Sequence, residues 1–115
     1  MNAMELNVDQ MKVNAHHASK LLSALCNEKR LLILCHLVAG ERSVNSLVEA
    51  LQIRQSTVSQ HLALLRTEGL VMARREAQTI YYSLRGEKAR ALLETLYRLY
   101  CAPDSKGATR PGQQQ

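Results

Sequence analysis

The chain has 115 residues, which leaves room for one domain with a single core and little room for a catalytic cleft beside a binding domain. Hydrophobic residues make up 46% of it, but no apolar run approaches the roughly 20 residues that a bilayer-spanning helix needs. The first ten residues include Glu5 and Asp9 and lack the basic-then-apolar order of a secretory signal. We therefore expect a soluble, cytoplasmic protein with no membrane partner.

The net charge is +5, and the excess lies in one half of the chain. Acidic and basic residues balance in residues 1–50, five of each, whereas residues 51–115 hold ten basic and five acidic ones. A one-sided basic surface attracts a polyanion. Because there is no Trp or Phe and the arginines are scattered, a membrane-binding amphipathic helix is not indicated. Nucleic acid is the predicted partner.

Apolar residues follow helical spacing in three segments of the first half, about 8–25, 28–38 and 43–51. Asn27 and Ser43 are suitable N-caps for the second and third segments. The second segment is apolar almost all round, as in a central buried helix. Three consecutive helices are predicted, with the second at the centre of the core.

The fourth predicted helix, about 55–68, has two clearly different faces. Its apolar stripe consists of Val58, Leu62 and Leu65. The opposite face carries Ser56, Ser59, Gln60, Ala63 and Thr67. This face has no acidic residue and only short or hydrogen-bonding side chains, so it can enter a major groove without repelling phosphates.

Two strands follow, at 70–75 and 79–84, the second with clear alternation. The connection Glu76-Ala77-Gln78 contains no Gly or Asn, so the predicted hairpin depends on the flanking pattern rather than on turn chemistry. A last helix is predicted at about 87–100, with an apolar stripe too broad for one small core. Residues 102–115, with two Pro and two Gly, are predicted to be a disordered tail.

The resulting order, α-α-α-α-β-β-α over residues 1–101, is that of a winged helix-turn-helix domain, mainly α with a small β-hairpin wing. The surplus apolar faces of the first and last helices predict a homodimer that pairs through them. A two-fold protein suits a palindromic site in double-stranded DNA, with half-sites about one helical turn, ~35 Å, apart.

The side chains that we expect to contact DNA lie on the fourth helix and the hairpin. Glutamine can pair with adenine edges, short hydroxyl side chains can reach bases or phosphates, and arginine can hold the backbone. The expected set is Arg54, Gln55, Ser56, Thr57, Ser59, Gln60, Arg74, Arg75, Gln78 and Thr79. His61 lies on the flank of the apolar stripe, so we expect it to pack or hydrogen-bond rather than read bases.

Three cysteines in a chain without a signal peptide indicate free thiols, metal ligands or a redox pair. A cysteine on an apolar helix, such as Cys35, is usually a small buried hydrophobic residue. Cys26 begins a helix close to Lys29 and Arg30, a setting that favours a thiolate. These residues alone leave open which thiol reacts.

Specific segments resemble a known family. The stretches Asn27–Leu34 and Gln55–Leu62, followed by Leu65 and Gly69-Leu70-Val71, are similar to the ArsR/SmtB family of bacterial repressors, and the likeness covers residues 15–101. The resemblance implies a winged helix-turn-helix regulator of transcription.

Within that family, Cys35, Cys101 after Arg98-Leu99-Tyr100, and residues 74–79 resemble the sulfide-responsive branch that includes SqrR, BigR and HlyU. The likeness implies that reactive sulfur species link Cys35 to Cys101, as a disulfide or a polysulfide, and change DNA affinity. The function expected is that of a repressor; an activator that displaces a silencing protein is the alternative from HlyU. Cys26 is outside the branch pattern, and Arg54 replaces a helix-capping Ser.

Two other classes of function are less well supported. A metal-sensing repressor needs three or four convergent ligands, but the third helix has no Cys or His, and adjacent His16 and His17 diverge by ~100° on a helix. In an enzyme, Cys35 and His36 would need to face each other, which helical neighbours do not. We expect no enzyme, no metal site and no cofactor.

Overall fold

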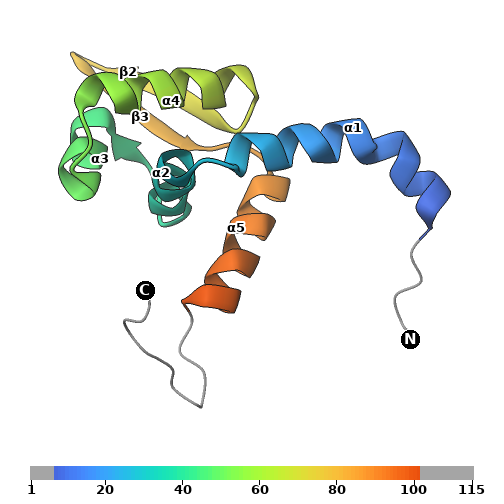
Figure 1. Cartoon of the computed structure of the whole chain (residues 1–115). Coiled ribbons are helices and arrows are strands. Elements are labelled where there is room, and N and C mark those ends of the chain that lie inside the picture. The colour runs from blue at the N-terminus through green and yellow to red at the C-terminus, as the bar shows by residue number, and fades with distance from the viewer. Residues whose placement is uncertain (1–6, 102–115) are drawn as a thin grey trace.

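The computed structural model describes residues 7–101, so the tail expected at 102–115 lies outside the described part. The elements in chain order are α1 (Val8–Leu25), α2 (Glu28–Val38), β1 (Arg42–Ser43), α3 (Val44–Leu51), α4 (Gln55–Thr67), β2 (Val71–Glu76), β3 (Thr79–Leu84) and α5 (Glu87–Tyr100). The predicted order of helices and hairpin is confirmed, and β1 is an additional element (Figure 1). None of the helices in this range has both the length and the hydropathy needed to cross a bilayer.

Local side-chain chemistry sets the starts of the central helices. The Asn27 side chain accepts a hydrogen bond from the Arg30 backbone N–H at 3.0 Å, and Ser43 accepts one from the Ser46 N–H at 3.1 Å. Both expected N-caps are therefore present, and each satisfies a donor that the helix itself cannot. Arg54, at the same position before α4, makes no capping bond.

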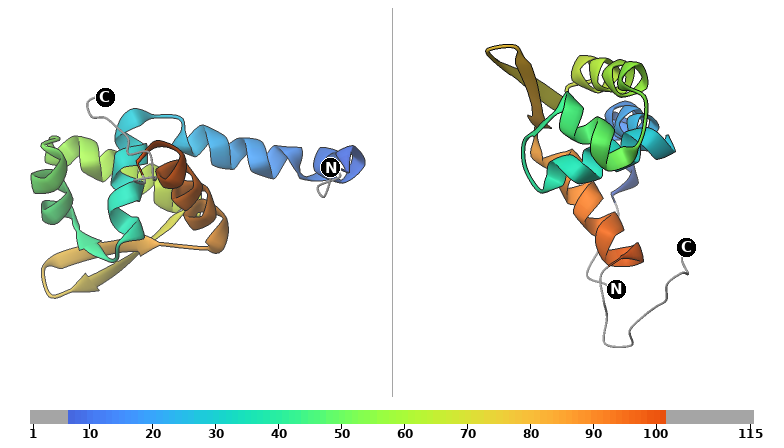
Figure 2. Two further views of the ribbon diagram at one scale, coloured as in Figure 1. Left: turned by 90° about the horizontal axis from the view of Figure 1, so that it is seen from below. Right: turned by 90° about the vertical axis from the view of Figure 1, so that its left-hand side faces the viewer.

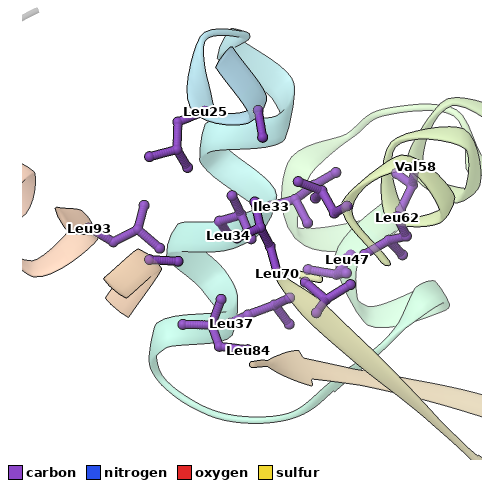
Figure 3. Packing of buried hydrophobic residues seen from close by; sticks show 14 residues of the cluster. Leu25, Ile33, Leu34, Leu37, Leu47, Val58, Leu62, Leu70, Leu84 and Leu93 are labelled. Carbon is purple, nitrogen blue, oxygen red and sulfur yellow. The ribbon is translucent and has the colours of Figure 1, made fainter. Parts of the chain in front are cut away.

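Helix α2 lies in the middle of the core (Figure 3). Ile33 and Leu34 are fully buried, and they share one buried cluster with side chains from the other helices, from Leu70 just before β2 and from Leu84 of β3. The predicted central position of α2 is confirmed, but its burial is incomplete, because Leu32 and Cys35 are exposed. These two residues are three apart and share a helix face, and α5 approaches this face at Cys35, where the two helices border a groove.

The sheet has three antiparallel strands in the order β1-β3-β2. Glu76 pairs with Thr79, so the hairpin turn consists of Ala77 and Gln78 only, and not of the three residues that the sequence indicated. Ala77 adopts a φ of 57°, and tight two-residue turns require such a positive φ at the first position. β1 has only two residues, too few to show alternation in the sequence.

The outer helices α1 and α5 extend away from this core (Figure 1). Only Ala24 and Leu25 of α1 are buried. The exposed large hydrophobic residues of the two helices are Val8, Met11, Val13, Leu22, Tyr97, Leu99 and Tyr100. Between α1 and the start of α5 lies a groove of about 640 Å³, whose walls include Met11 and Leu92. The predicted surplus of apolar surface on these helices is present in the fold.

Candidate nucleic-acid interface and thiol pair

Helix α4 presents the polar face that the sequence predicted. Its apolar stripe is fully buried, whereas the members of the opposite face (Ser56, Ser59, Gln60, Ala63 and Thr67) are all exposed. The helix contains no Asp or Glu. Arg54 and Gln55 are exposed at its N-terminus, and Thr57 is half-buried. An exposed face free of carboxylates, at the second helix of a helix-turn-helix, can approach the edges of base pairs.

The hairpin of β2 and β3 lies on the same end of the molecule as α4, away from α5 (Figure 2, right). Arg75 and Gln78 are exposed and Thr79 is half-buried. The fold thus brings α4 and the hairpin, which follow each other in the chain, to one end of the domain. This arrangement lets the helix enter a groove while the hairpin contacts the flanking backbone.

Arg74 lies in the hairpin but is held by neighbours within the protein. Its Nε and Nη2 donate to the two carboxylate oxygens of Glu41 at 3.0 and 2.8 Å, and its Nη1 donates to Glu76 at 2.9 Å. The guanidinium also lies 4.8 Å from the centre of the Tyr81 ring. The hydrogen bonds from Arg74 lower the pKa of Glu41, and those same bonds raise the pKa of Arg74.

Glu41 was missed by the sequence analysis because it is 33 residues from Arg74. A lone acidic residue in a loop after a helix gives no pattern that points to a distant partner. Arg75, in contrast, makes no side-chain hydrogen bond or ion pair with any residue between 7 and 101. The two adjacent arginines of the hairpin therefore have different environments.

Cys35 opens onto a second groove, of about 350 Å³, between α2 and α5. The groove is lined by Cys35, Val38, Ala39, Leu93, Glu94, Tyr97 and Arg98. Cys35 is exposed in the protomer, so the reading of it as a buried hydrophobic residue is wrong. The pKa of its thiol is raised, chiefly because the groove walls remove solvent from one side and also because the charge of Cys101 is near.

Cys101 follows the last turn of α5 and is exposed. Its backbone N–H donates to the Tyr97 carbonyl oxygen at 2.7 Å, which places it one turn beyond a residue that lines the groove. Cys101 does not itself line the groove, but its charge acts on the Cys35 thiol. Cys26 ends α1 and is also exposed, but it does not line this groove.

Two further candidates from the sequence are a metal site and His61. Within residues 7–101, no three His, Cys, Asp or Glu side chains converge as metal ligands would. His61 is half-buried, as expected for a residue that packs, and its pKa is lowered by desolvation and by Arg30 and Lys29.

Comparison with known proteins places this architecture in a family. Residues 27–73 match the family described as bacterial regulatory protein, arsR family. The transcriptional activator HlyU of Vibrio cholerae is 48% identical over 96 residues, which cover 84% of this chain and 89% of HlyU. The crystal structure of the transcriptional repressor BigR from Xylella fastidiosa is 38% identical, with a TM-score of 0.80 over 84% of this chain and 99% of that one.

A homodimeric winged helix-turn-helix DNA-binding domain from Mycobacterium bovis is also similar. It is 31% identical, with a TM-score of 0.69, over 86% of this chain and 89% of that one. Both the DNA-binding fold and the homodimer are thus found among similar structures. The chain belongs to the arsR family of bacterial regulatory proteins and is a DNA-binding transcriptional regulator, similar to HlyU and BigR, and not an enzyme.

Proposed function

We propose that this protein is a dithiol-based repressor that acts in the cytoplasm as a homodimer and binds a palindromic promoter site when its cysteines are reduced. The exposed, acid-free face of α4 supports this function. The residues that we assign to DNA contact are Arg54, Gln55, Ser56, Thr57, Ser59, Gln60, Arg75, Gln78 and Thr79, with Arg74 behind them in the hairpin.

The dimer forms through α1 and α5 in this proposal. Leu22 on α1 and Leu99 on α5 are 56% and 70% exposed in the protomer, and the groove beside α1 is lined mainly by apolar side chains. An isologous interface buries the same patches on both protomers. Pairing here places the two copies of α4 at a fixed separation, which determines the half-site spacing.

The signal in this proposal is a persulfide, which oxidises the two thiols. One of the two cysteine thiolates attacks the outer sulfur of a persulfide RSSH, so that a cysteine persulfide forms on the protein and the thiol RSH leaves. The thiolate of the other cysteine then attacks Sγ of that persulfide, and the disulfide forms as hydrogen sulfide leaves. The persulfide is reduced to RSH and H₂S, and the protein dithiol is oxidised. Further sulfane sulfur extends the link to a polysulfide.

A link between Cys35 and Cys101 changes DNA affinity because it joins α2 to the end of the dimerising helix. Arg90 of α5 already donates to the Val38 carbonyl oxygen at the end of α2, at 3.1 Å. α2 also packs against α3 and α4. A covalent link across the α2–α5 groove therefore shifts the population away from the α4 spacing that fits the site.

The observation that carries the sulfur-sensing proposal is that Cys35 lines the groove between α2 and α5 and that Cys101 directly follows α5, whereas Cys26 follows α1. The 48% identity with a protein named a transcriptional activator favours a second candidate, in which the same DNA occupancy displaces a silencing protein. The two candidates share the thiol switch and differ in its effect on expression. A reporter behind the bound promoter separates them, because deletion of the regulator raises expression in one case and lowers it in the other.

The test uses a duplex that the wild-type protein selects from a random-sequence pool. Cysteine persulfide should weaken binding by a factor within about 5–150, the usual range of allosteric coupling. Mass spectrometry should find a linked pair of peptides that contain Cys35 and Cys101. C35S and C101S should bind when reduced but lose the response, whereas the matched control C26S should keep it.

Two outcomes would overturn the switch. One is a C35S variant that still releases DNA with persulfide. The other is release by zinc or cadmium and not by persulfide, which would make the protein a metal sensor.

A further inference from the structure

The wing carries two consecutive arginines on opposite faces of β2. Val71 is buried and Ala73 half-buried, so the odd-numbered residues face the helices, and Arg75 continues this face toward the hairpin turn. Arg74 and Glu76 share the other face, and Tyr81 pairs with Arg74 across the strands. Sequence alone gives both arginines the same expected role, but the fold gives them different surroundings.

The Arg74 side chain spans the sheet. Glu41 directly precedes β1, and β1 is separated from β2 by β3. The bidentate Arg74–Glu41 pair thus connects the loop after α2 to the far strand, across the central one. β1 pairs with β3 through only two residues. The Arg74–Glu41 pair therefore adds a third point at which the segment after α2 is attached to the hairpin. Planar, two-point pairing of this kind fixes orientation as well as distance.

The same contacts engage most of the donors of Arg74. Its Nε, Nη1 and Nη2 each donate one of the five N–H groups of the guanidinium to a carboxylate within the protein, at distances between 2.8 and 3.0 Å. A phosphate that approached the remaining N–H groups would be repelled by these two carboxylates. Arg75 has no such partner among residues 7–101 and is exposed on the face that looks toward α4.

We propose that Arg75 is the phosphate contact of the wing, and that Glu41 and Arg74 are positioning residues that hold the hairpin at the angle at which Arg75 meets the DNA backbone. This proposal rests on the proposed DNA-binding function and adds a division of roles between the two arginines. It also assigns a role in DNA binding to an acidic residue, Glu41, which itself cannot contact phosphate favourably.

Substitution of Glu41 tests this proposal, because an electrostatic role and a positioning role predict changes of opposite sign in DNA affinity. The substitution E41Q removes a negative charge and frees donors of Arg74. If charge alone mattered, or if Arg74 were the phosphate contact, E41Q would bind DNA as tightly as wild type or more tightly. If the pair positions the hairpin, E41Q binds more weakly despite its higher positive charge.

A second test replaces Arg74 and Arg75 by lysine, each in a separate variant. Lysine keeps the charge and can contact a phosphate as a point charge, but it cannot form a bidentate pair with a carboxylate. R75K should therefore bind nearly as well as wild type, whereas R74K should resemble E41Q. If Arg74 were the phosphate contact, R74K would instead bind nearly as well as wild type.

The experiment measures binding to the duplex selected by the reduced wild-type protein, over a series of salt concentrations. E41Q, R74K and R75Q should each lose about tenfold in affinity, a typical effect of one lost charge-assisted contact. Each should also lower the slope of log K against log salt by about 0.9, the value for one phosphate contact. The double variant E41Q/R75Q should be no weaker than R75Q, because both changes remove the same contact.

The control E49Q removes one carboxylate from α3. The Glu49 side chain makes no ion pair among the described residues. It should leave the affinity unchanged or raise it, with the full salt slope. The proposal is overturned if E41Q binds as tightly as wild type, or if R74K keeps the wild-type slope. All variants change exposed side chains, and equal unfolding midpoints exclude a general loss of fold. If the wild-type protein selects no duplex, the DNA-binding function itself fails.

Discussion

The central helices and the outer helices of this domain bury their apolar residues to very different extents. In α2, α3 and α4, residues such as Leu34, Leu47 and Leu62 are fully buried by one another and by the sheet. On α1 and α5, in contrast, Leu22, Leu99 and several other apolar side chains remain exposed. The apolar side chains of the central helices are thus largely buried within one protomer, whereas many of those on the outer helices are not.

The central helices therefore bear mainly on the stability of the protomer, and the outer helices on the regulation that we propose. The centre fixes the geometry of α4 within each protomer. In the proposed dimer, the spacing between the two copies of α4 depends on α1 and α5, and the groove that Cys35 lines lies where α5 meets the centre. A change at that groove can thus alter the spacing while each protomer stays folded.

The largest effect is expected from truncation in the centre. Leu34→Ala removes a fully buried side chain of α2 and should lower the free energy of unfolding by about 2–5 kcal/mol. Leu32→Ala, on the same helix but 43% exposed, should cost less than about 1 kcal/mol. Urea denaturation measures both. Equal losses at the two positions would contradict the assignment of the core to one face of α2.

A smaller effect, of a different kind, is expected on the outer helices. The double variant L22A/L99A should raise the dissociation constant of the dimer about 10–100-fold, because each truncation removes exposed apolar area that the proposed interface would bury. Sedimentation at several concentrations measures this constant. Leu64→Ala, on α4 and 41% exposed, is the matched control and should leave it unchanged. A dimer that tolerates the double variant would exclude pairing through α1 and α5.

The same comparison explains how far the sequence could predict the fold. The helices and the hairpin have clear periodicity and caps, so their order and approximate ends could be predicted. β1 could not, because two residues carry no period. The exposure of Cys35 was also missed: apolar side chains on all faces of α2 do not reveal which face packs in the protomer and which faces a groove.

The candidate site was predictable only in part, for a related reason. Local pattern identified the polar face of α4, whose residues lie within three turns of one helix. The Glu41–Arg74 pair joins residues 33 positions apart and follows from the sheet order, which local pattern does not determine. The approach of Cys101 to the Cys35 groove likewise depends on how α5 crosses α2. Neither arrangement produces a local periodic pattern in the sequence.

The smallest expected effect is a dependence of stability on pH, and it arises from two histidines of the central helices. His36 and His61 are half-buried, and their pKa values are lowered, first by desolvation and then by Arg42 and by Arg30 and Lys29, respectively. The folded state therefore binds fewer protons than the unfolded state at mildly acidic pH. Stability then rises with pH in this window, and the contribution is lost as the pH falls below the ordinary histidine value of about 6.5.

Urea midpoints between about pH 5 and pH 7.5 test this dependence, since carboxylates such as Glu41 titrate mainly below that range. H36Q/H61Q should flatten the profile, because it removes both groups that resist protonation in the fold. H16Q/H17Q, on the exposed part of α1, is the matched control and should retain the wild-type slope. If the slope persisted in H36Q/H61Q, or disappeared in H16Q/H17Q, the acid sensitivity would not arise from the packed centre.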